Sequence, residues 1–119
     1  MPFPAFTSLL SCRLLLAAAA LALLPVPALA VALDGAPGIA ALAGDTDGTD
    51  GGAGSADDPA GAVIDQTTLP RARSLGLDPA HFLSDNDSTG FFSRLGDLVE
   101  TGPTWTNVND FRAIVVDRP

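Results

Sequence analysis

The sequence contains no lysine and no tyrosine, and its single cysteine is Cys12. Without lysine the chain cannot form a Walker-type phosphate loop, a lysine Schiff base or a site with lysine as general base. A single cysteine excludes an internal disulfide framework and a metal site made of several cysteines. Because Cys12 lies among apolar residues, we interpret it as a small hydrophobic side chain.

Aromatic and basic residues are also few, since the 119-residue chain has one Trp, six Phe and six Arg. A chain of this length forms one small domain at most, and few large side chains are available for its core. The formal net charge of -8 excludes a protein that binds nucleic acid through the phosphate backbone, because such binding needs a basic surface. The acidic excess is compatible with divalent cations.

Residues 1–30 carry the pattern of an export signal. Arg13 precedes the apolar run Leu14–Leu24, and a small-x-small cleavage pattern ends at Ala30. The run predicts an apolar N-terminal helix. It is shorter than the roughly 20 residues that cross a membrane, so we expect no stable membrane span.

Residues 28–33 also fit a different structure, the last turns of an Ala/Leu helix that a glycine at Gly35 closes. Cleavage after Ala30 would cut through this helix. The two interpretations therefore exclude each other in one mature protein.

The segment Asp45–Gly51, which we call the acidic loop, directly follows an apolar run at 38–43 that predicts a buried strand. Its carboxylates Asp45, Asp47 and Asp50 can surround one cation, or face a polyanion through Mg²⁺. Ligands of open α/β sheets lie beyond the carboxyl ends of strands, which is where this loop is expected. The alternative is an ordinary solvated turn.

Apolar runs and polar breaks alternate in the rest of the chain, as is typical of short strands and helices. The expected strands are 62–64, 98–100 and 111–116, and the expected helices run from Thr67 or Thr68 to Leu75, from Asp78 to Ser84, and through Phe91, Phe92 and Leu95 to Gly96. The order of strand, loop, helices, strand, loop and strand predicts an α/β fold. The last strand is apolar on one face and mixed on the other.

A second polar loop, Thr101–Asn107, follows the expected strand at 98–100, and we call it the threonine loop. It carries hydroxyl and amide groups and no charge. Exposed backbone N–H groups and threonine hydroxyls of this kind cradle phosphate or carboxylate oxygens. The candidate residues of this loop are Thr101, Gly102, Thr104, Thr106 and Asn107.

With both loops in view, the chain resembles the MOFRL domain, the C-terminal domain of class II glycerate kinases, some of which carry the older name hydroxypyruvate reductase. The motifs that carry the resemblance keep their order and spacing across residues 28–117. They are Asp34–Gly38, Leu42–Gly51, Ala60–Asp65, Gly76–Pro79, Leu83–Ser88, Phe91–Phe92, Leu95–Leu98 and Thr101–Asp110. Residues 1–27 fall outside the resemblance, so we expect the domain to occupy 28–117.

The resemblance implies transfer of a phosphoryl group from ATP to D-glycerate, giving 2-phosphoglycerate, with Mg²⁺. In that family the site lies in a cleft between a large N-terminal Rossmann-like domain and this smaller domain. The resemblance then assigns Asp45, Asp47 and Asp50 to the metal. The substrate- or nucleotide-binding set consists of these three residues with Thr46, Gly48, Thr101, Gly102, Thr104, Thr106 and Asn107.

The chain departs from the family in three places. The larger domain and its catalytic lysine are absent, and Leu21–Pro27 stands where the family has a Gly-Arg-Asn motif whose arginine supports catalysis. Trp105 occupies a position at which the family commonly has a small residue. We therefore expect the chain alone to be an inactive fragment without a catalytic residue, with a separate N-terminal kinase domain as candidate partner.

A calcium-binding module, secreted or periplasmic, is the alternative from another class. The spacing of the acidic residues in the loop does not fit the ligand positions of a helix-loop-helix calcium site. Counted from Asp45, the obligatory glycine position holds Asp50 and position twelve holds Ala56. We expect a cytoplasmic protein, with export and cleavage after Ala30 as the alternative.

Overall fold

The computed structural model describes residues 26–117 of the chain. Short helices and strands alternate along it. In chain order they are α2 (Val26–Leu33), β1 (Ile39–Asp45), β2 (Gly61–Ile64), α3 (Thr68–Ser74), α4 (Pro79–Ser84), α5 (Ser88–Leu95), β3 (Leu98–Val99) and β4 (Asp110–Val116). The expected apolar N-terminal helix, the signal pattern up to residue 25 and most of the expected segment 1–27 lie outside the described residues.

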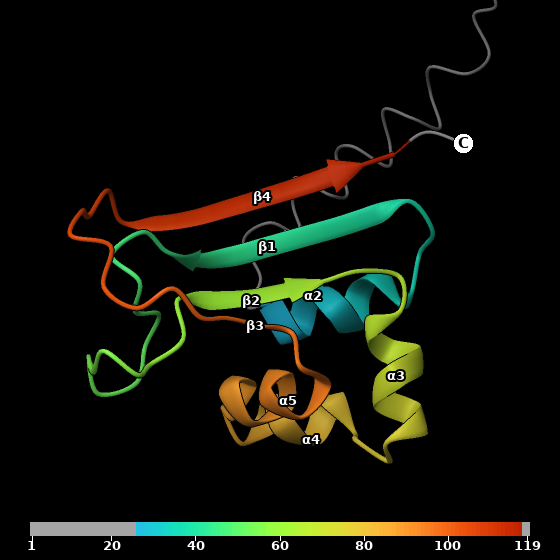
Figure 1. The fold of residues 1–119 in the computed structure, drawn as a ribbon. Helices are drawn as coiled ribbons and strands as arrows, with labels where there is room; N and C mark the ends of the chain where they lie inside the picture. Colours follow the sequence, from blue (N-terminus) through green and yellow to red (C-terminus); the bar gives the residue numbers. More distant parts are fainter. Residues whose placement is uncertain (1–25, 118–119) are drawn as a thin grey trace, which may run out of the picture.

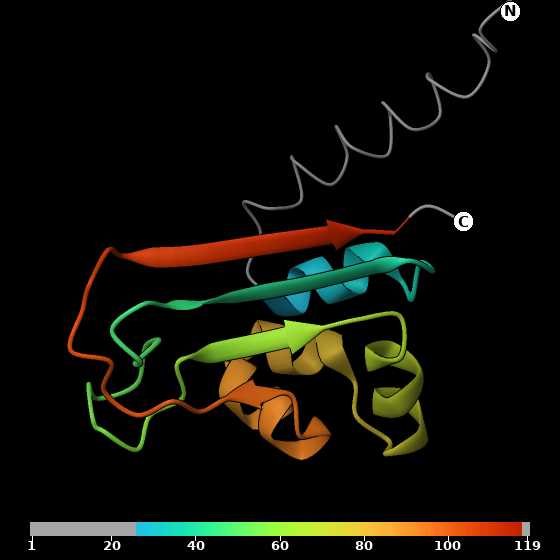
Figure 2. The ribbon, with the colours of Figure 1, turned by 45° about the horizontal axis from the view of Figure 1, so that its top comes forward.

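The strands form a four-stranded sheet in the order β3-β2-β1-β4, and every neighbouring pair is antiparallel. The helices gather on one face of this sheet, as the two views in Figures 1 and 2 show. The α/β prediction is thus confirmed. The end of the sheet beside the acidic loop carries the carboxyl end of β1 and the amino ends of β2 and β4, because these neighbours are antiparallel.

Helix α2 confirms the interpretation of residues 28–33 as helix, and it begins at Val26. Leu29 and Ala30 are buried in the core, where they meet Phe91 and Phe92 of α5. The two phenylalanine rings pack edge to face with centroids 5.1 Å apart, a favourable arrangement for aromatic pairs. Phe91 and Phe92 are thus the largest fully buried side chains of the described residues.

Helix ends follow the expected residues with one exception. Asp78 accepts a hydrogen bond from the backbone N–H of Ala80, and Asp87 accepts one from that of Gly90. Thr67 is the N-cap residue of α3, but its side chain makes no capping bond. The carboxylate of Asp65 accepts the backbone N–H of Thr67 instead, because a carboxylate two residues earlier reaches that group in an Asx turn.

Each strand differs from its expected bounds by one or two residues, since β1 begins at Ile39, β2 at Gly61 and β4 at Asp110. β1 continues through Gly44 to Asp45, and β3 ends at Val99 rather than residue 100. Pairing with β4 extends β1, because Asp45 lies opposite Asp110. None of the helices in the described part of the chain is long and apolar enough to cross a membrane.

Candidate functional site

The acidic loop and the threonine loop meet at one end of the sheet. The register of β1 and β4 places Asp45 opposite Asp110, so the loop that leaves β1 lies beside the segment that enters β4. Figures 1 and 2 show both segments together beyond this edge. The structure therefore brings together the two segments that the sequence singled out.

Thr46 joins the two segments through its backbone and side chain. Its backbone N–H donates to the carbonyl oxygen of Asn109 at 3.3 Å, and its hydroxyl donates to the same oxygen at 2.9 Å. That hydroxyl also accepts the backbone N–H of Val108 at 2.8 Å. A side chain bonded on both sides in this way is a structural link, since its hydroxyl is already engaged.

Thr104 completes the contact from the opposite direction. Its backbone N–H donates to the carbonyl oxygen of Asp47 at 3.0 Å, and its hydroxyl donates to the carbonyl oxygen of Thr46. We call this set of cross-bonds between the two loops the clasp. It fixes the acidic loop against the threonine loop without help from a ligand.

The carboxylate of Asp47 belongs to the clasp. One oxygen accepts the backbone N–H of Thr49 at 2.9 Å, and the other accepts the side-chain amide of Asn107 at 3.2 Å. Asn107 in turn accepts the backbone N–H of Asn109 through its amide oxygen. Asp47 and Asn107 therefore bind each other, and their polar atoms shape the loops.

Gly48 lies where the two loops approach most closely. It has φ +96, and a Cβ at this position would lie 2.0 Å from the carbonyl oxygen of Gly102. No side chain fits at that distance, and positive φ itself favours glycine. Gly48 and Gly102, both candidates from the sequence, thus permit the close approach of the loops.

Asp45 and Asp50 are placed differently from Asp47. One carboxylate oxygen of Asp45 is buried and has no hydrogen-bond partner. The pKa of Asp50 is raised, first because burial penalises the charged form and then because Asp110 and Asp45 repel it, while Arg112 acts in the opposite direction. A cation near Asp45 and Asp50 would give the buried oxygen of Asp45 a partner and would offset the burial and the repulsion that act on Asp50.

The three carboxylates that the resemblance assigns to a metal have different surroundings in the structure. Within residues 26–117, no group of three or more His, Cys, Asp or Glu side chains is arranged to hold a metal ion. Mg²⁺ usually takes only one or two carboxylates, and water and substrate phosphates complete its coordination. Asp45 and Asp50 fit that smaller role, whereas both oxygens of Asp47 already accept hydrogen bonds in the clasp.

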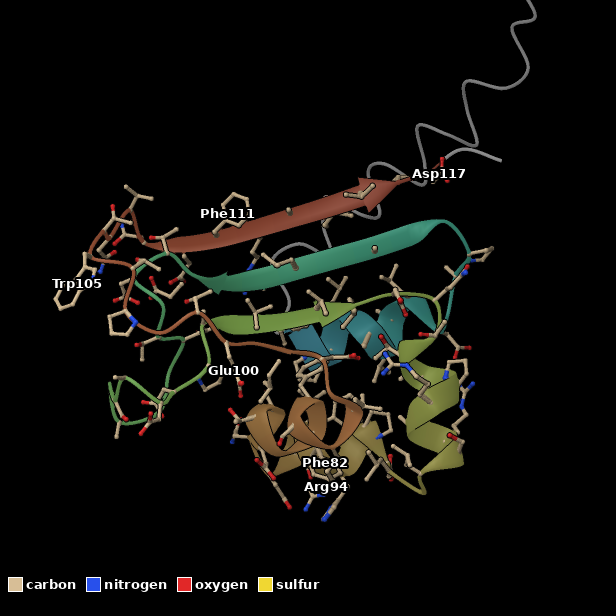
Figure 3. The ribbon with its side chains drawn as sticks, in the orientation of Figure 1. Phe82, Arg94, Glu100, Trp105, Phe111 and Asp117 are labelled. Carbon is tan, nitrogen blue, oxygen red and sulfur yellow. The ribbon has the colours of Figure 1, made fainter. Side chains whose placement is uncertain are left out.

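The remaining candidates of the threonine loop lie at the surface. The hydroxyl of Thr101 donates to the carbonyl of Gly102, and the carbonyl of Thr106 accepts from the hydroxyl of Thr104. Trp105 at the tip is 94% exposed and has φ +62, and Figure 3 shows its ring pointing away from the sheet. Left-handed backbone is unfavourable for a bulky residue, which explains why a small residue suits this position.

Sequence analysis missed the residues that surround Asp50 on the helix side of the sheet. A polar pocket of about 360 Å³ is lined there by Asp50, the glycines that follow it, Arg112 of β4, and Asn86, Ser88 and Thr89 at the start of α5. The motif Leu83–Ser88 carries the resemblance but has no role in the predicted site. The alternation of β4 does place Arg112 on the mixed face, but only the fold brings it near the acidic loop.

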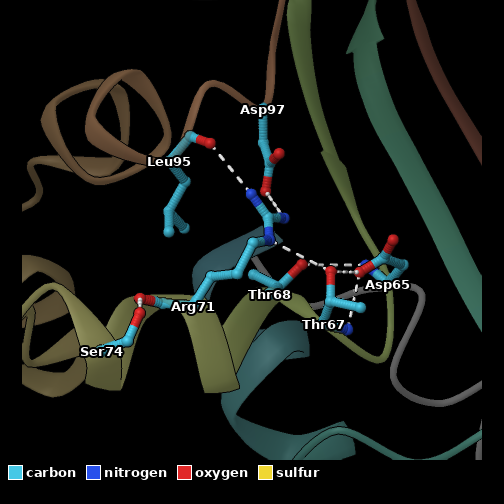
Figure 4. A network of polar contacts seen from close by, with 7 residues as sticks. All are labelled: Asp65, Thr67, Thr68, Arg71, Ser74, Leu95 and Asp97. Atoms are coloured by element: carbon cyan, nitrogen blue, oxygen red, sulfur yellow. Dashed lines mark hydrogen bonds and ion pairs between the residues drawn. The ribbon is translucent and has the colours of Figure 1, made fainter.

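A second polar network lies at the other end of the sheet and stabilises the fold. Arg71 of α3 donates to the carbonyl of Leu95 at 2.9 Å and to the carboxylate of Asp97 at 2.6 Å (Figure 4). The hydrogen bond to Asp97 raises the pKa of Arg71. The pKa of Asp65 is lowered, first by its hydrogen bond from the Thr67 hydroxyl. The network connects α3 to the turn between α5 and β3.

The sequence model of the MOFRL family matches residues 15–110. The chain belongs to the MOFRL family. A protein of Agrobacterium vitis, named provisionally as a hydroxypyruvate reductase, is 56% identical over 88 residues, which are 74% of this chain and 19% of that protein. D-glycerate 2-kinase of Thermotoga maritima is 42% identical over 81 residues, 68% of this chain and 18% of the kinase.

Part of a solved glycerate kinase has the same fold as this chain. The crystal structure of glycerate kinase from Thermotoga maritima superposes with a TM-score of 0.70 and 37% identity, over 76% of this chain and 21% of that one. The chain thus spans about a fifth of the length of these relatives. The resemblance drawn from the ordered motifs is confirmed, and the matched region forms one part of longer enzymes.

Proposed function

We propose that this chain is the C-terminal part of a glycerate 2-kinase, which transfers a phosphoryl group from ATP to D-glycerate and forms 2-phosphoglycerate. The observation that carries the proposal is the clasp between the acidic and threonine loops, in a chain 42% identical to a D-glycerate 2-kinase. Phosphoryl transfer depends mostly on positioning and charge neutralisation. Loops rich in carboxylate, hydroxyl and amide groups suit that task.

The roles within the proposal follow the geometry of the loops. Asp45 and Asp50 would hold Mg²⁺ together with oxygens from outside this chain, and the metal would neutralise charge on the phosphates. Asp47, Thr46 and Thr104 keep the two loops in register. These residues contribute no catalytic group of their own, so residues 1–119 alone are inactive and the N-terminal kinase domain of the family completes the site.

Two preparations test the proposal. The full 119-residue chain should give no ATP-dependent phosphorylation of D-glycerate. A chimera, in which residues 34–117 replace the matching segment of the Thermotoga maritima kinase, should be active. Phosphorylation by the lone chain would contradict its inactivity, and a folded but inactive chimera would contradict the kinase assignment.

A matched pair of variants in the chimera separates the metal role from the clasp. Asp50→Asn should lower activity by at least about tenfold, as loss of a metal-supporting carboxylate does, and higher Mg²⁺ should restore part of it. Asp57→Asn changes an exposed carboxylate of the same long loop and should leave activity unchanged. Equal losses in both variants would contradict a specific role for Asp50.

We propose a cytoplasmic location as well. The cleavage pattern after Ala30 lies inside α2, and cleavage would remove Leu29 and Ala30 from the core. N-terminal sequencing of the protein from its source cells tests this, because a mature chain that begins at Val31 would demonstrate export.

A further inference from the structure

The polar pocket on the helix side of the sheet has a chemistry that differs from that of the two loops. It is lined by two charged residues, Arg112 and Asp50, and by three uncharged polar residues, Asn86, Ser88 and Thr89. We call this cavity the α5 pocket, after the helix that begins beside it. All of these groups belong to the described part of this chain, so the pocket can bind a ligand without groups from elsewhere.

Small residues of the sheet leave space for the α5 pocket. The register places Arg112 of β4 opposite Ala43 of β1, and Gly61 of β2 lines the pocket without a side chain. Ile114 of β4 packs against the core, and strand alternation puts Arg112, two residues earlier, on the same helix side. The charge of Arg112 acts there on Asp50.

The uncharged polar side chains of the α5 pocket are available to a ligand. Among residues 26–117, the side chains of Asn86, Ser88 and Thr89 have no hydrogen-bond partner. The hydroxyls of Thr46 and Thr104 in the clasp, by contrast, are both engaged. The pocket therefore holds donors and acceptors that the fold itself does not use, and a few convergent polar groups of this kind are typical of ligand sites.

Charge selects the class of ligand. The pocket offers one guanidinium and one carboxylate, and Asp45 and Asp110 add negative charge close to Asp50. A triphosphate without its metal would meet one positive and several negative groups, so these charges oppose its binding. A single carboxylate matches a single arginine, which can hold it through two parallel N–H donors.

Size and polarity favour a short ligand. The volume of the pocket is about 360 Å³, at the lower end of the range of roughly 300–1,000 Å³ for ligand sites. Two of its lining residues, Pro27 of α2 and Phe92 of α5, are apolar and fully buried. An apolar wall excludes water and strengthens the attraction between opposite charges. Such a pocket suits a short acid that also carries hydroxyl groups.

We propose that the α5 pocket binds a small hydroxy acid, with Arg112 on the carboxylate and Ser88 and Thr89 on the hydroxyl groups. In the reaction proposed above this acid is D-glycerate, so the identity of the ligand rests on the proposed function. Asp50 belongs both to the pocket and to the acidic loop. A hydroxy acid bound here therefore has its hydroxyl groups beside a carboxylate that we assigned to Mg²⁺.

NMR spectroscopy of the isotope-labelled full chain tests the pocket without catalysis. Titration with D-glycerate should shift the backbone amides of Asn86, Ser88 and Thr89 and reach saturation. Arg112→Gln should weaken binding at least about tenfold, because a charge-assisted hydrogen bond is lost, and Arg112→Lys should restore part of the affinity. Arg73→Gln, at an exposed arginine of α3, is the matched control and should bind as the unmodified chain does.

Three further ligands separate a hydroxy-acid pocket from a general anion site. Propionate has the carboxylate and no hydroxyl group, so it should bind at least about fivefold more weakly than D-glycerate. Inorganic phosphate and metal-free ATP should leave the amides of Ser88 and Thr89 unshifted. The proposal would be overturned by a lack of saturable shifts with D-glycerate, by equal binding of propionate, or by the same shifts with phosphate or metal-free ATP.

A second variant covers the case that Arg112→Gln does not fold. Thr89→Val removes one hydroxyl at an exposed position of α5 and keeps the size of the side chain. It should weaken the binding of D-glycerate and leave the binding of propionate unchanged. Unchanged affinity for D-glycerate would contradict the contact between Thr89 and the hydroxyl groups of the ligand.

Steady-state kinetics of the chimera described above connects the pocket with the reaction. Arg112→Gln should raise KM for D-glycerate at least about tenfold and leave KM for ATP unchanged, because it removes a contact to only one substrate. An unchanged KM for D-glycerate in an active chimera would overturn the pocket proposal and leave the kinase assignment standing. Saturable binding of D-glycerate by the full chain, together with a folded but inactive chimera, would contradict only the kinase assignment.

Discussion

The two faces of the sheet are built from almost equally apolar residues, yet the helices within residues 26–117 pack on only one of them. Ala41 and Ile64 lie on the covered face, where they meet α2 and α5 and are buried. Leu42 and Val63, one residue away on the same strands, lie on the other face, which no helix of the described residues covers and which we call the open face. Apolar character along a strand therefore does not tell which face of the sheet the helices cover.

The largest expected difference between the two faces of the sheet is the loss of stability when one phenylalanine on each face is truncated. Phe91→Ala removes a fully buried ring and should lower the free energy of unfolding by about 3–5 kcal/mol. Phe111→Ala on the open face should change it by no more than about 0.5 kcal/mol. Urea unfolding of the full chain measures both, and equal losses would show that the open face is packed within this chain.

The next largest effect concerns the two arginines of α3. Arg71→Ala leaves the Asp97 carboxylate, which is 11% exposed, and the carbonyl of Leu95 without this donor. We expect a loss of about 1–2 kcal/mol. Arg73→Ala removes only the exposed pair with Asp34 and should cost less than about 1 kcal/mol. Thermal unfolding of the two variants compares them, and a larger loss for Arg73→Ala would contradict the assignment.

The smallest effect is a difference in pH dependence between Asp50 and Asp65, because solvent still reaches both residues and screens their carboxyls. Because the pKa of Asp50 is raised, its contribution to the free energy of unfolding is fully present below pH 3.8, the ordinary pKa of an aspartate. That contribution is lost as pH rises through the raised pKa. The lowered pKa of Asp65 gives stability present above 3.8 and lost as pH falls through the lowered pKa.

Unfolding of Asp50→Asn and Asp65→Asn between pH 3 and 7 measures this difference. At pH 7, Asp50→Asn should be more stable than the unmodified chain and Asp65→Asn less stable. Both differences should shrink at the acidic end. The same sign for the two variants at pH 7 would show that the two carboxyls do not lie in opposite environments.

Most of the local structure could be predicted from the sequence. The strands and helices lie within two residues of their expected positions at most ends, because apolar alternation, Asp78-Pro79 and Gly96 act over only a few residues. The exceptions are informative. Asp65 replaces the Thr67 side chain at the start of α3, and pairing with Asp110 carries β1 through to Asp45.

The candidate site was predicted as a set of residues and not as an arrangement. Both loops, and the glycines within them, could be chosen from composition and order. The contacts between the two loops could not be predicted. Asn107 lies 60 residues from Asp47 in the sequence, and the local sequence does not show that the two side chains bind each other. Asp47 therefore looked equivalent to Asp45 and Asp50, although it holds the loops together.

The sequence by itself determined the elements, the two polar loops and the family, since each depends on residue types at short spacing and in a fixed order. The tertiary structure decided which carboxylates remain available, because the antiparallel register of β1 and β4 brings the loops into contact and engages Asp47. It also decided which apolar face stays open. Alternation along a strand marks two faces, but only the packing of the helices selects the one that this chain covers.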